Sequence, residues 1–110
     1  YDNRDFFSFR ERYRQAGIGL PLVPGLLPVV SLAQIQRIAS LCGATLPAPF
    51  AADLETHRED PAAQVSVGVE STIRQCRELC GAGIPGIHFY VLNRADATRR
   101  ILEALELPRP

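Results

Sequence analysis

A buried-strand pattern near the C-terminal end of the chain stops at a polar pair. Residues 88–95 read His-Phe-Tyr-Val-Leu-Asn-Arg-Ala, so aromatic and β-branched side chains give way to Asn93 and Arg94. In parallel α/β folds, binding and catalytic side chains lie where strands end and loops begin. An Arg in that position suits a carboxylate or a phosphate, because its planar guanidinium can bind two oxygens at once. Spacing alone leaves open the alternative that Arg94 forms a surface salt bridge.

We predict a strand over residues 86–92, and alternation along it and on to Asn93 assigns the side chains to two faces. His88, Tyr90 and Leu92 share one face, and Phe89, Val91 and Asn93 share the other. If Leu92 faces the site, Tyr90 lies one layer deeper and His88 deepest. We therefore expect His88 to be a buried, hydrogen-bonded core residue rather than a catalytic base.

Two other segments also fit the junction between a strand and a loop. We expect Tyr1 and Asp2 to end a strand, so that Asp2-Asn3 forms one junction. The run 20–24 has strand length, with Leu22 and Val23 available to pair because the prolines cannot donate to a ladder. The segment 24–31, which begins Pro-Gly-Leu-Leu-Pro, is then the loop that follows this strand.

Helical segments separate these strands, and their ends carry recognisable capping residues. Asp5 and Ser31 can each accept hydrogen bonds from a helix N-terminus, and Pro61 suits a first helical turn. We predict five helices, each with apolar residues at helical spacing. The first follows Asp5 and runs through Phe6, Phe9, Tyr13 and Ala16, and the second covers residues 32–41 with Ile35 and Ile38 inward. A short third helix follows Pro47 and runs through Phe50 and Leu54, and the fourth runs from Pro61 to Leu79. The fifth covers residues 95–105 with Ile101, Leu102 and Leu105 inward, and Pro108 ends it.

Strands that alternate with helices indicate a parallel sheet in an α/β fold. The chain has 110 residues, well short of the roughly 250 typical of a (β/α)8 barrel. We interpret residues 1–110 as the C-terminal fragment of one such domain, about its last two and a half βα units. Because two parallel strands leave unpaired sheet edges, the isolated chain should be marginally stable or should borrow a partner, and we expect a homo-oligomer.

Composition excludes several classes of function. Twelve basic and twelve acidic residues give no net charge, which argues against nucleic-acid binding. No apolar run reaches the roughly 18 residues of a membrane span, and the cysteines lack the paired spacing of a zinc site. Free cysteines fit a reducing, cytoplasmic setting. No glycine-rich dinucleotide fingerprint or nucleophile motif is present, so we assign no catalytic residue and no metal site to this chain.

Two motifs together resemble the methylenetetrahydrofolate reductase family. The family carries a Pro-Gly-(Ile/Leu)-(Leu/Met)-Pro loop after its seventh strand and His-Phe-Tyr-Thr-Leu-Asn-Arg-Ala in its eighth. Here these read Pro24-Gly-Leu-Leu-Pro28 and His88-Phe-Tyr-Val-Leu-Asn-Arg-Ala95. Ala-Gly-Ile at residues 16–18 and the C-terminal Leu107-Pro-Arg-Pro110 are also similar, so the likeness spans essentially the whole chain.

The resemblance implies a (β/α)8 barrel and a flavin-dependent reduction in one-carbon metabolism. In this family FAD lies across the C-terminal ends of the strands, NAD(P)H reduces it, and the hydride then converts 5,10-methylenetetrahydrofolate to 5-methyltetrahydrofolate, a supply for methionine biosynthesis. The family's proton-donating Glu and most of its flavin contacts lie upstream of the matching segment.

Two substrate-binding positions of the family fall on residues of this chain. Gln34 matches a Gln in the helix after the seventh strand, where its amide would bind the polar part of the folate. Arg94 matches the Arg after the eighth strand, where it would position the anionic tail of the substrate. For Gln34, spacing alone favours an ordinary solvent-facing helix residue.

One position departs from the family pattern. Some members place a Phe over the bound ligand where this chain has Ile38, and an aliphatic side chain cannot stack on a nicotinamide or pterin ring as an aromatic can. A non-catalytic folate-binding or assembly module, derived from the barrel without flavin chemistry, is the alternative reading. A fragment of another flavoprotein barrel is a third.

Overall fold

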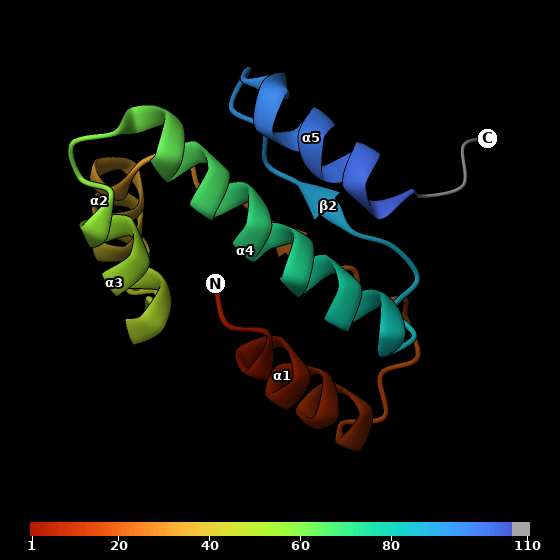
Figure 1. The fold of residues 1–110 in the computed structure, drawn as a ribbon. Coiled ribbons are helices and arrows are strands. Elements are labelled where there is room, and N and C mark those ends of the chain that lie inside the picture. The colour runs from red at the N-terminus through yellow and green to blue at the C-terminus, as the bar shows by residue number, and fades with distance from the viewer. Residues whose placement is uncertain (107–110) are drawn as a thin grey trace.

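The computed structural model describes residues 1–106 and contains five helices and two short strands. The order is α1 (Asn3–Gln15), β1 (Gly25–Leu26), α2 (Leu32–Cys42), α3 (Ala48–Thr56), α4 (Pro61–Gly81), β2 (His88–Phe89) and α5 (Ala95–Leu105) (Figure 1). The two strands are parallel, with three helices between them in sequence. This confirms the predicted α/β class and all five predicted helices. The predicted stop at Pro108 lies outside the described residues.

Side-chain caps fix the start of three helices. Ser31 Oγ accepts the backbone N–H of Gln34 at 3.1 Å, as expected, and Asp60 Oδ1 accepts that of Ala63 at 3.1 Å in front of Pro61. The cap of α1 is Asp2 rather than Asp5, because the Asp2 carboxylate accepts the N–H of Arg4 at 3.0 Å. The helix therefore begins one turn earlier than predicted, and Tyr1 and Asp2 lie outside any strand of the structure.

The strand pairing lies further along the chain than the sequence suggested. Gly25 pairs with His88 and Leu26 with Phe89, instead of a strand at 20–24 pairing through Leu22 and Val23. Pro24 cannot donate a hydrogen bond but its carbonyl can accept one, and it accepts the N–H of His88 at 2.9 Å. Pairing therefore starts at Pro24 and continues to Leu26, whose carbonyl accepts the N–H of Tyr90 at 2.9 Å.

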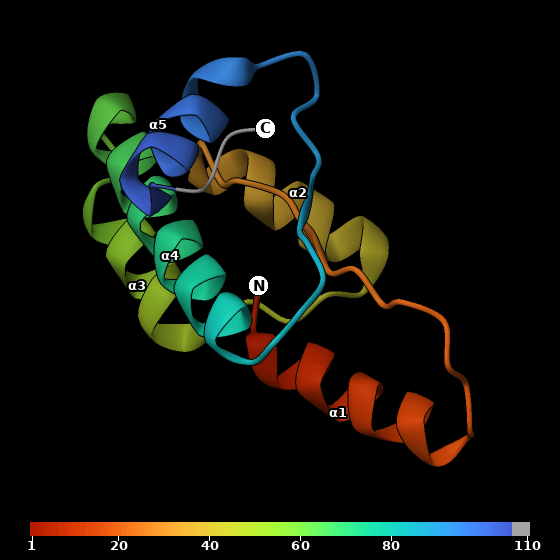
Figure 2. The same ribbon diagram turned by 90° about the vertical axis from the view of Figure 1, so that its right-hand side faces the viewer.

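The long helix α4 organises the core. It lies between α5 on one side and α1 on the other (Figure 1). Figure 2 shows the segments that carry β1 (orange) and β2 (blue) coming together, and the two strands pair in parallel. The main cluster of buried apolar residues joins β1, α4 and α5: Leu26, Val69, Cys76, Leu79, Ala97 and Ile101. Burial of this apolar cluster is the main force that holds the strand pair against the helices.

Some residues of the predicted apolar sets are exposed in the structure. Phe9 in α1 is exposed, and Phe6 and Phe7 pack against the main cluster in its place. Leu102 in α5 is also exposed, whereas Ile101 is fully buried and Leu105 partly so.

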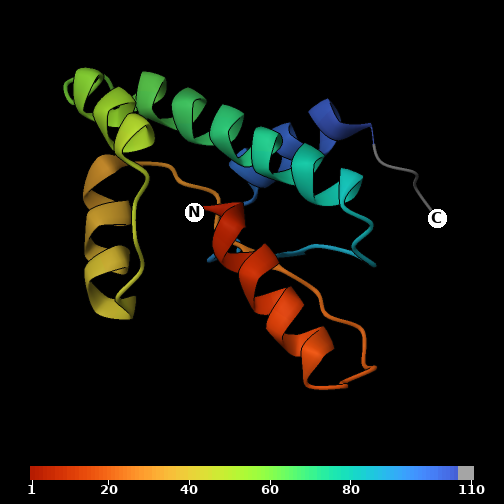
Figure 3. The same ribbon diagram turned by 90° about the horizontal axis from the view of Figure 1, so that it is seen from below.

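A second cluster holds α2 and α3 at the start of α4 (Figure 3). Its buried residues are Val29, Leu32, Ile35, Phe50 and Leu54. The buried Gln64 of α4 ties this end together, because its Oε1 accepts the N–H of Leu32 at 2.8 Å and its Nε2 donates to the carbonyls of His57 and Arg58. The position of α2, which carries Gln34, is thus set by α4.

Candidate functional site

Gln34 lies in the first turn of α2 and is partly buried. Its Oε1 accepts the backbone N–H of Val30 at 3.3 Å, while its own backbone N–H donates to Ser31 Oγ. These two hydrogen bonds are close to a capping box, in which the side chain of a Gln three residues after a Ser cap accepts a backbone N–H at the start of the helix. The amide oxygen is therefore engaged, and the amide NH2 group is the part of Gln34 that can donate to a ligand.

Arg94 follows β2 at the end of a tight turn. The Arg94 N–H donates to the Val91 carbonyl at 2.8 Å, and the two residues between them, Leu92 and Asn93, have φ of 48° and 62°. Asn adopts this left-handed region readily, but for Leu it is unusual and strained. Strain of this kind clusters at functional sites, where the surrounding structure enforces it. Here the turn places the exposed Arg94 at the N-terminus of α5.

The N-terminus of α5 favours a negatively charged ligand. Arg94 is its N-cap residue, and its side chain makes no capping hydrogen bond. The first N–H groups of a helix lack intrahelical partners and carry a partial positive charge, to which the guanidinium adds. Asp96 in the first turn partly offsets this field.

Gln34, in α2, and Arg94, the residue before α5, line one cavity. Its volume is about 20 Å³, and Tyr90, Leu92 and Thr98 also line it. The structure therefore brings together the two residues that the sequence singled out as substrate-binding. Their role in binding folate stays a prediction.

The deep placement of His88 is wrong for this chain. His88 is exposed, and its ring stacks edge-to-face on Tyr90 with the ring centroids 4.7 Å apart. The physical reason is that helices cover only one side of the strand pair, so the face with His88, Tyr90 and Leu92 is open. Tyr90, expected one layer deeper than Leu92, is 53% exposed and lines the cavity with Gln34 and Arg94.

A larger apolar groove of about 520 Å³ lies beside this cavity. It shares Tyr90 and Leu92 with the cavity and is bordered by Ile38, with Gly25 and Leu26 among its other lining residues. Ile38 is partly buried here, so the predicted position at the edge of a ligand site is consistent with the geometry. The lining can pack against a planar ring, but it contains no Lys or Arg to bind a pyrophosphate. These residues fit FAD only as an apolar wall and cannot hold it by themselves.

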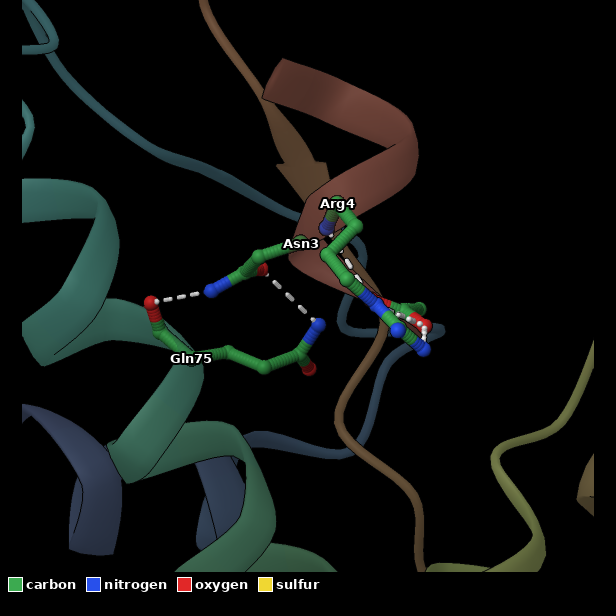
Figure 4. A network of polar contacts seen from close by, with 4 residues as sticks. Asn3, Arg4 and Gln75 are labelled. Atoms are coloured by element: carbon green, nitrogen blue, oxygen red, sulfur yellow. Dashed lines mark hydrogen bonds and ion pairs between the residues drawn. The ribbon is translucent and has the colours of Figure 1, made fainter. Parts of the chain in front are cut away.

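The junction at Asp2-Asn3 has a structural role. Asn3 is buried, its Nδ2 donates to the Gln75 carbonyl at 3.0 Å, and the Gln75 Nε2 donates to Asn3 Oδ1 at 3.2 Å (Figure 4). Asp2 binds Arg4 through a bidentate pair, whose hydrogen bonds hold the pKa of the Asp2 carboxyl at about 2. Asn3 therefore joins α1 to α4, whereas Asp2 caps α1 and binds Arg4 of the same helix.

Within residues 1–106, no helix is both long and apolar enough to cross a membrane. Within the same range, no three His, Cys, Asp or Glu side chains gather as metal ligands would.

Comparison with known proteins gives a consistent result. The family model described as methylenetetrahydrofolate reductase matches residues 1–106. Methylenetetrahydrofolate reductase 1 of Schizosaccharomyces pombe is 33% identical over 107 residues, which are 97% of this chain and 18% of that protein. The probable methylenetetrahydrofolate reductase (NADPH) of Caenorhabditis elegans is 35% identical over 108 residues, 97% of this chain and 16% of that protein.

A bacterial relative matches over a larger share of its own length. The 5,10-methylenetetrahydrofolate reductase of Escherichia coli (strain K12) is 30% identical over 105 residues, which are 96% of this chain and 36% of that protein. The chain thus spans between about a sixth and about a third of the length of these relatives. The match to the family model covers nearly the whole chain and confirms the resemblance seen in its two motifs. The chain belongs to the methylenetetrahydrofolate reductase family.

Proposed function

We propose that the chain is the C-terminal part of the catalytic domain of a flavin-dependent methylenetetrahydrofolate reductase. The reaction is the reduction of 5,10-methylenetetrahydrofolate to 5-methyltetrahydrofolate by NAD(P)H by way of FAD. Support comes from membership of the family and from the names of its relatives. They include the probable methylenetetrahydrofolate reductase (NADPH) of Caenorhabditis elegans and methylenetetrahydrofolate reductase (NADH) 1 of Arabidopsis thaliana.

The observation that carries this proposal is the shared cavity of Gln34 and Arg94. In the proposed site, the Arg94 guanidinium binds a carboxylate in the anionic tail of the folate through two N–H donors. The Gln34 NH2 group donates to a carbonyl or ring acceptor of the same substrate. Both residues act by orienting the substrate, and correct orientation of bound reactants is a large contribution to hydride-transfer rates.

The remaining parts of the site are proposed to come from residues outside this chain. A (β/α)8 barrel would continue the β1–β2 pair and cover its open face, where Tyr90 and Leu92 are 53% and 60% exposed. FAD, when bound, supplies the hydride-transfer chemistry. This chain contributes to the flavin site only the apolar groove next to Ile38 and Tyr90. Assembly as a homo-oligomer and a place in the cytoplasm stay predictions.

The experiment is a comparison of the complete protein with the 110-residue chain. The complete protein should purify with bound flavin and should reduce 5,10-methylenetetrahydrofolate at the expense of NADH or NADPH. The isolated chain should bind no FAD and should have no reductase activity. A complete protein that is colourless but still binds folate would favour the non-catalytic module, and stoichiometric flavin on the isolated chain would contradict the division of the site proposed here.

A further inference from the structure

Thr98 carries a buried hydroxyl without a hydrogen-bond partner. The residue is only 8% exposed, and within residues 1–106 its Oγ1 is the one buried side-chain polar atom that is unpaired. Leaving such a group unpaired is costly, so nearly all buried hydroxyls in native proteins have a partner. Thr72, the other buried Thr near the core, shows the usual situation, because its Oγ1 donates to the Gly68 carbonyl at 2.9 Å.

The position of Thr98 indicates where its partner lies. It follows Arg94 by four residues along the chain, one helical turn into α5, so both lie on the same side of this helix end. Thr98 also lines the cavity that Gln34 and Arg94 share. The cavity volume of about 20 Å³ is enough for one water or one oxygen-sized group.

The polar groups around this cavity are mainly donors. The Arg94 guanidinium can only donate, and the Gln34 oxygen is already engaged by the Val30 N–H, which leaves its NH2 group. The Thr98 hydroxyl can rotate to donate as well. Tyr90 also lines the cavity, and its hydroxyl can donate or accept, whereas Pro28, Val91 and Ala97 have apolar side chains. A cavity lined mainly by donors favours a group that accepts hydrogen bonds.

We infer that Thr98 is a third substrate-binding residue, which donates a hydrogen bond to a carboxylate or amide oxygen of the folate held by Arg94 and Gln34. This inference rests on the proposed function and assigns the cavity as the subsite for that oxygen. Thr98 is a positioning residue whose effect falls on substrate affinity.

The test compares two variants of Thr98 in the complete protein. Thr98→Val is nearly isosteric but lacks the hydroxyl, Thr98→Ser retains it, and Thr72→Val serves as the control for loss of a buried Thr hydroxyl. The dissociation constant for 5-methyltetrahydrofolate is measured together with the melting temperature of the folate-free protein. Thr98→Val should raise the dissociation constant about three- to tenfold, as expected for one hydrogen bond. It should not lower the melting temperature, because the group removed is unpaired in the absence of ligand.

The controls separate failure of this inference from failure of the proposed function. Thr98→Ser should restore wild-type affinity, and Thr72→Val should lower the melting temperature without changing the affinity. If Arg94→Ala weakens binding but Thr98→Val does not, only the role of Thr98 is overturned. A drop in melting temperature for Thr98→Val with unchanged affinity would show that its partner is protein or water, which also overturns the inference. If the wild-type protein does not bind folate at all, the proposed function fails and this inference with it.

Discussion

Gly68 of α4 lies against the backbone of Val29 so closely that no other residue fits at position 68. A β-carbon there would overlap the Val29 carbonyl oxygen and would lie 2.7 Å from the carbonyl carbon. Both contacts are with backbone atoms, which cannot swing aside as a flexible side chain would. This contact fixes the segment between β1 and α2, and with it the approach to Gln34.

Gly68→Ala should therefore destabilise the protein even though Ala favours helices. The steric cost of about 1–3 kcal/mol for overfilling a packed site exceeds the gain of about 1 kcal/mol in helix propensity. The melting temperature of the complete protein should fall. Gly81→Ala in the same helix is the matched control, since a β-carbon there meets nothing within 4 Å, and it should be neutral or stabilising. Equal melting temperatures for the two variants would show that the contact with Val29 relaxes freely.

Gln64→Leu should also lower the melting temperature, through loss of hydrogen bonds. The substitution leaves the N–H of Leu32 without its acceptor at the start of α2, and an unsatisfied buried donor costs about 1–3 kcal/mol. Gln36→Leu on the exposed side of α2 is the control for replacing a Gln by Leu. If the two substitutions have the same effect, the link between α4 and α2 does not depend on Gln64.

Cys76 should be unreactive while Cys80, one turn further along α4, reacts readily. Burial raises the pKa of Cys76 to about 11, with a smaller contribution from Cys80, and Cys80 is exposed. Only the thiolate attacks a disulfide reagent, so at pH 8 the Ellman reagent should label Cys80 quickly and Cys76 only after unfolding. Mass spectrometry of the labelled peptides distinguishes the two sites, and labelling at similar rates would contradict the burial of Cys76.

The raised pKa of Cys76 also predicts a loss of stability at high pH. The folded state holds the thiol proton more tightly than the unfolded state, whose pKa is near the ordinary value of 9.0. The stabilising contribution is thus fully present below pH 9 and is lost between about pH 9 and pH 11. Cys76→Ala should reduce the slope of melting temperature against pH in this range, whereas Cys80→Ala should change the slope less, because Cys80 makes only the smaller contribution to the raised pKa of Cys76.

Gln34→Glu should separate the structural and substrate-binding roles of Gln34. A Glu carboxylate can still accept the Val30 N–H but has no NH2 group to donate, and its charge repels an anionic substrate. The melting temperature should stay close to that of the wild type, while the KM for methylenetetrahydrofolate rises about tenfold, through loss of one hydrogen bond together with the charge repulsion. Gln36→Glu introduces the same charge at an exposed position of the same helix and should leave KM unchanged. A similar rise in KM for both variants would indicate a general electrostatic effect.

Local signals in the sequence predicted the helices well, because their ends are set by side chains close in sequence. Ser31 and Pro61 mark helix starts correctly, and α2 ends at Gly43, whose φ of 66° is a conformation that favours glycine. The cap of α1 was misassigned because Asp2 and Asp5 are both competent caps. Only the observed hydrogen bond from Arg4 to Asp2 distinguishes them.

The strands were harder to place, because their ends depend on residues far away in the chain. The predicted strand at 86–92 has only two residues in the observed ladder, since its partner is limited by Pro24 and Pro28 on either side of Gly25 and Leu26. The burial of His88 was wrong for a similar reason: alternation predicts which residues share a face but cannot tell which face is covered. Thr98 had no sequence signal at all, because an unpaired hydroxyl becomes visible only when its surroundings are known.

The most direct test of the central claim is the effect of Arg94→Ala on the two half-reactions of the complete reductase. We predict that oxidation of NADH or NADPH with an artificial electron acceptor stays close to the wild-type rate. The kcat/KM for methylenetetrahydrofolate should fall at least about tenfold, as expected for loss of a charged hydrogen-bonded contact with the substrate. Arg94→Lys should recover only part of this loss, since an ammonium group cannot form the two-pronged contact. Equal loss of both half-reactions would contradict the account and would show that Arg94 supports the fold rather than the folate.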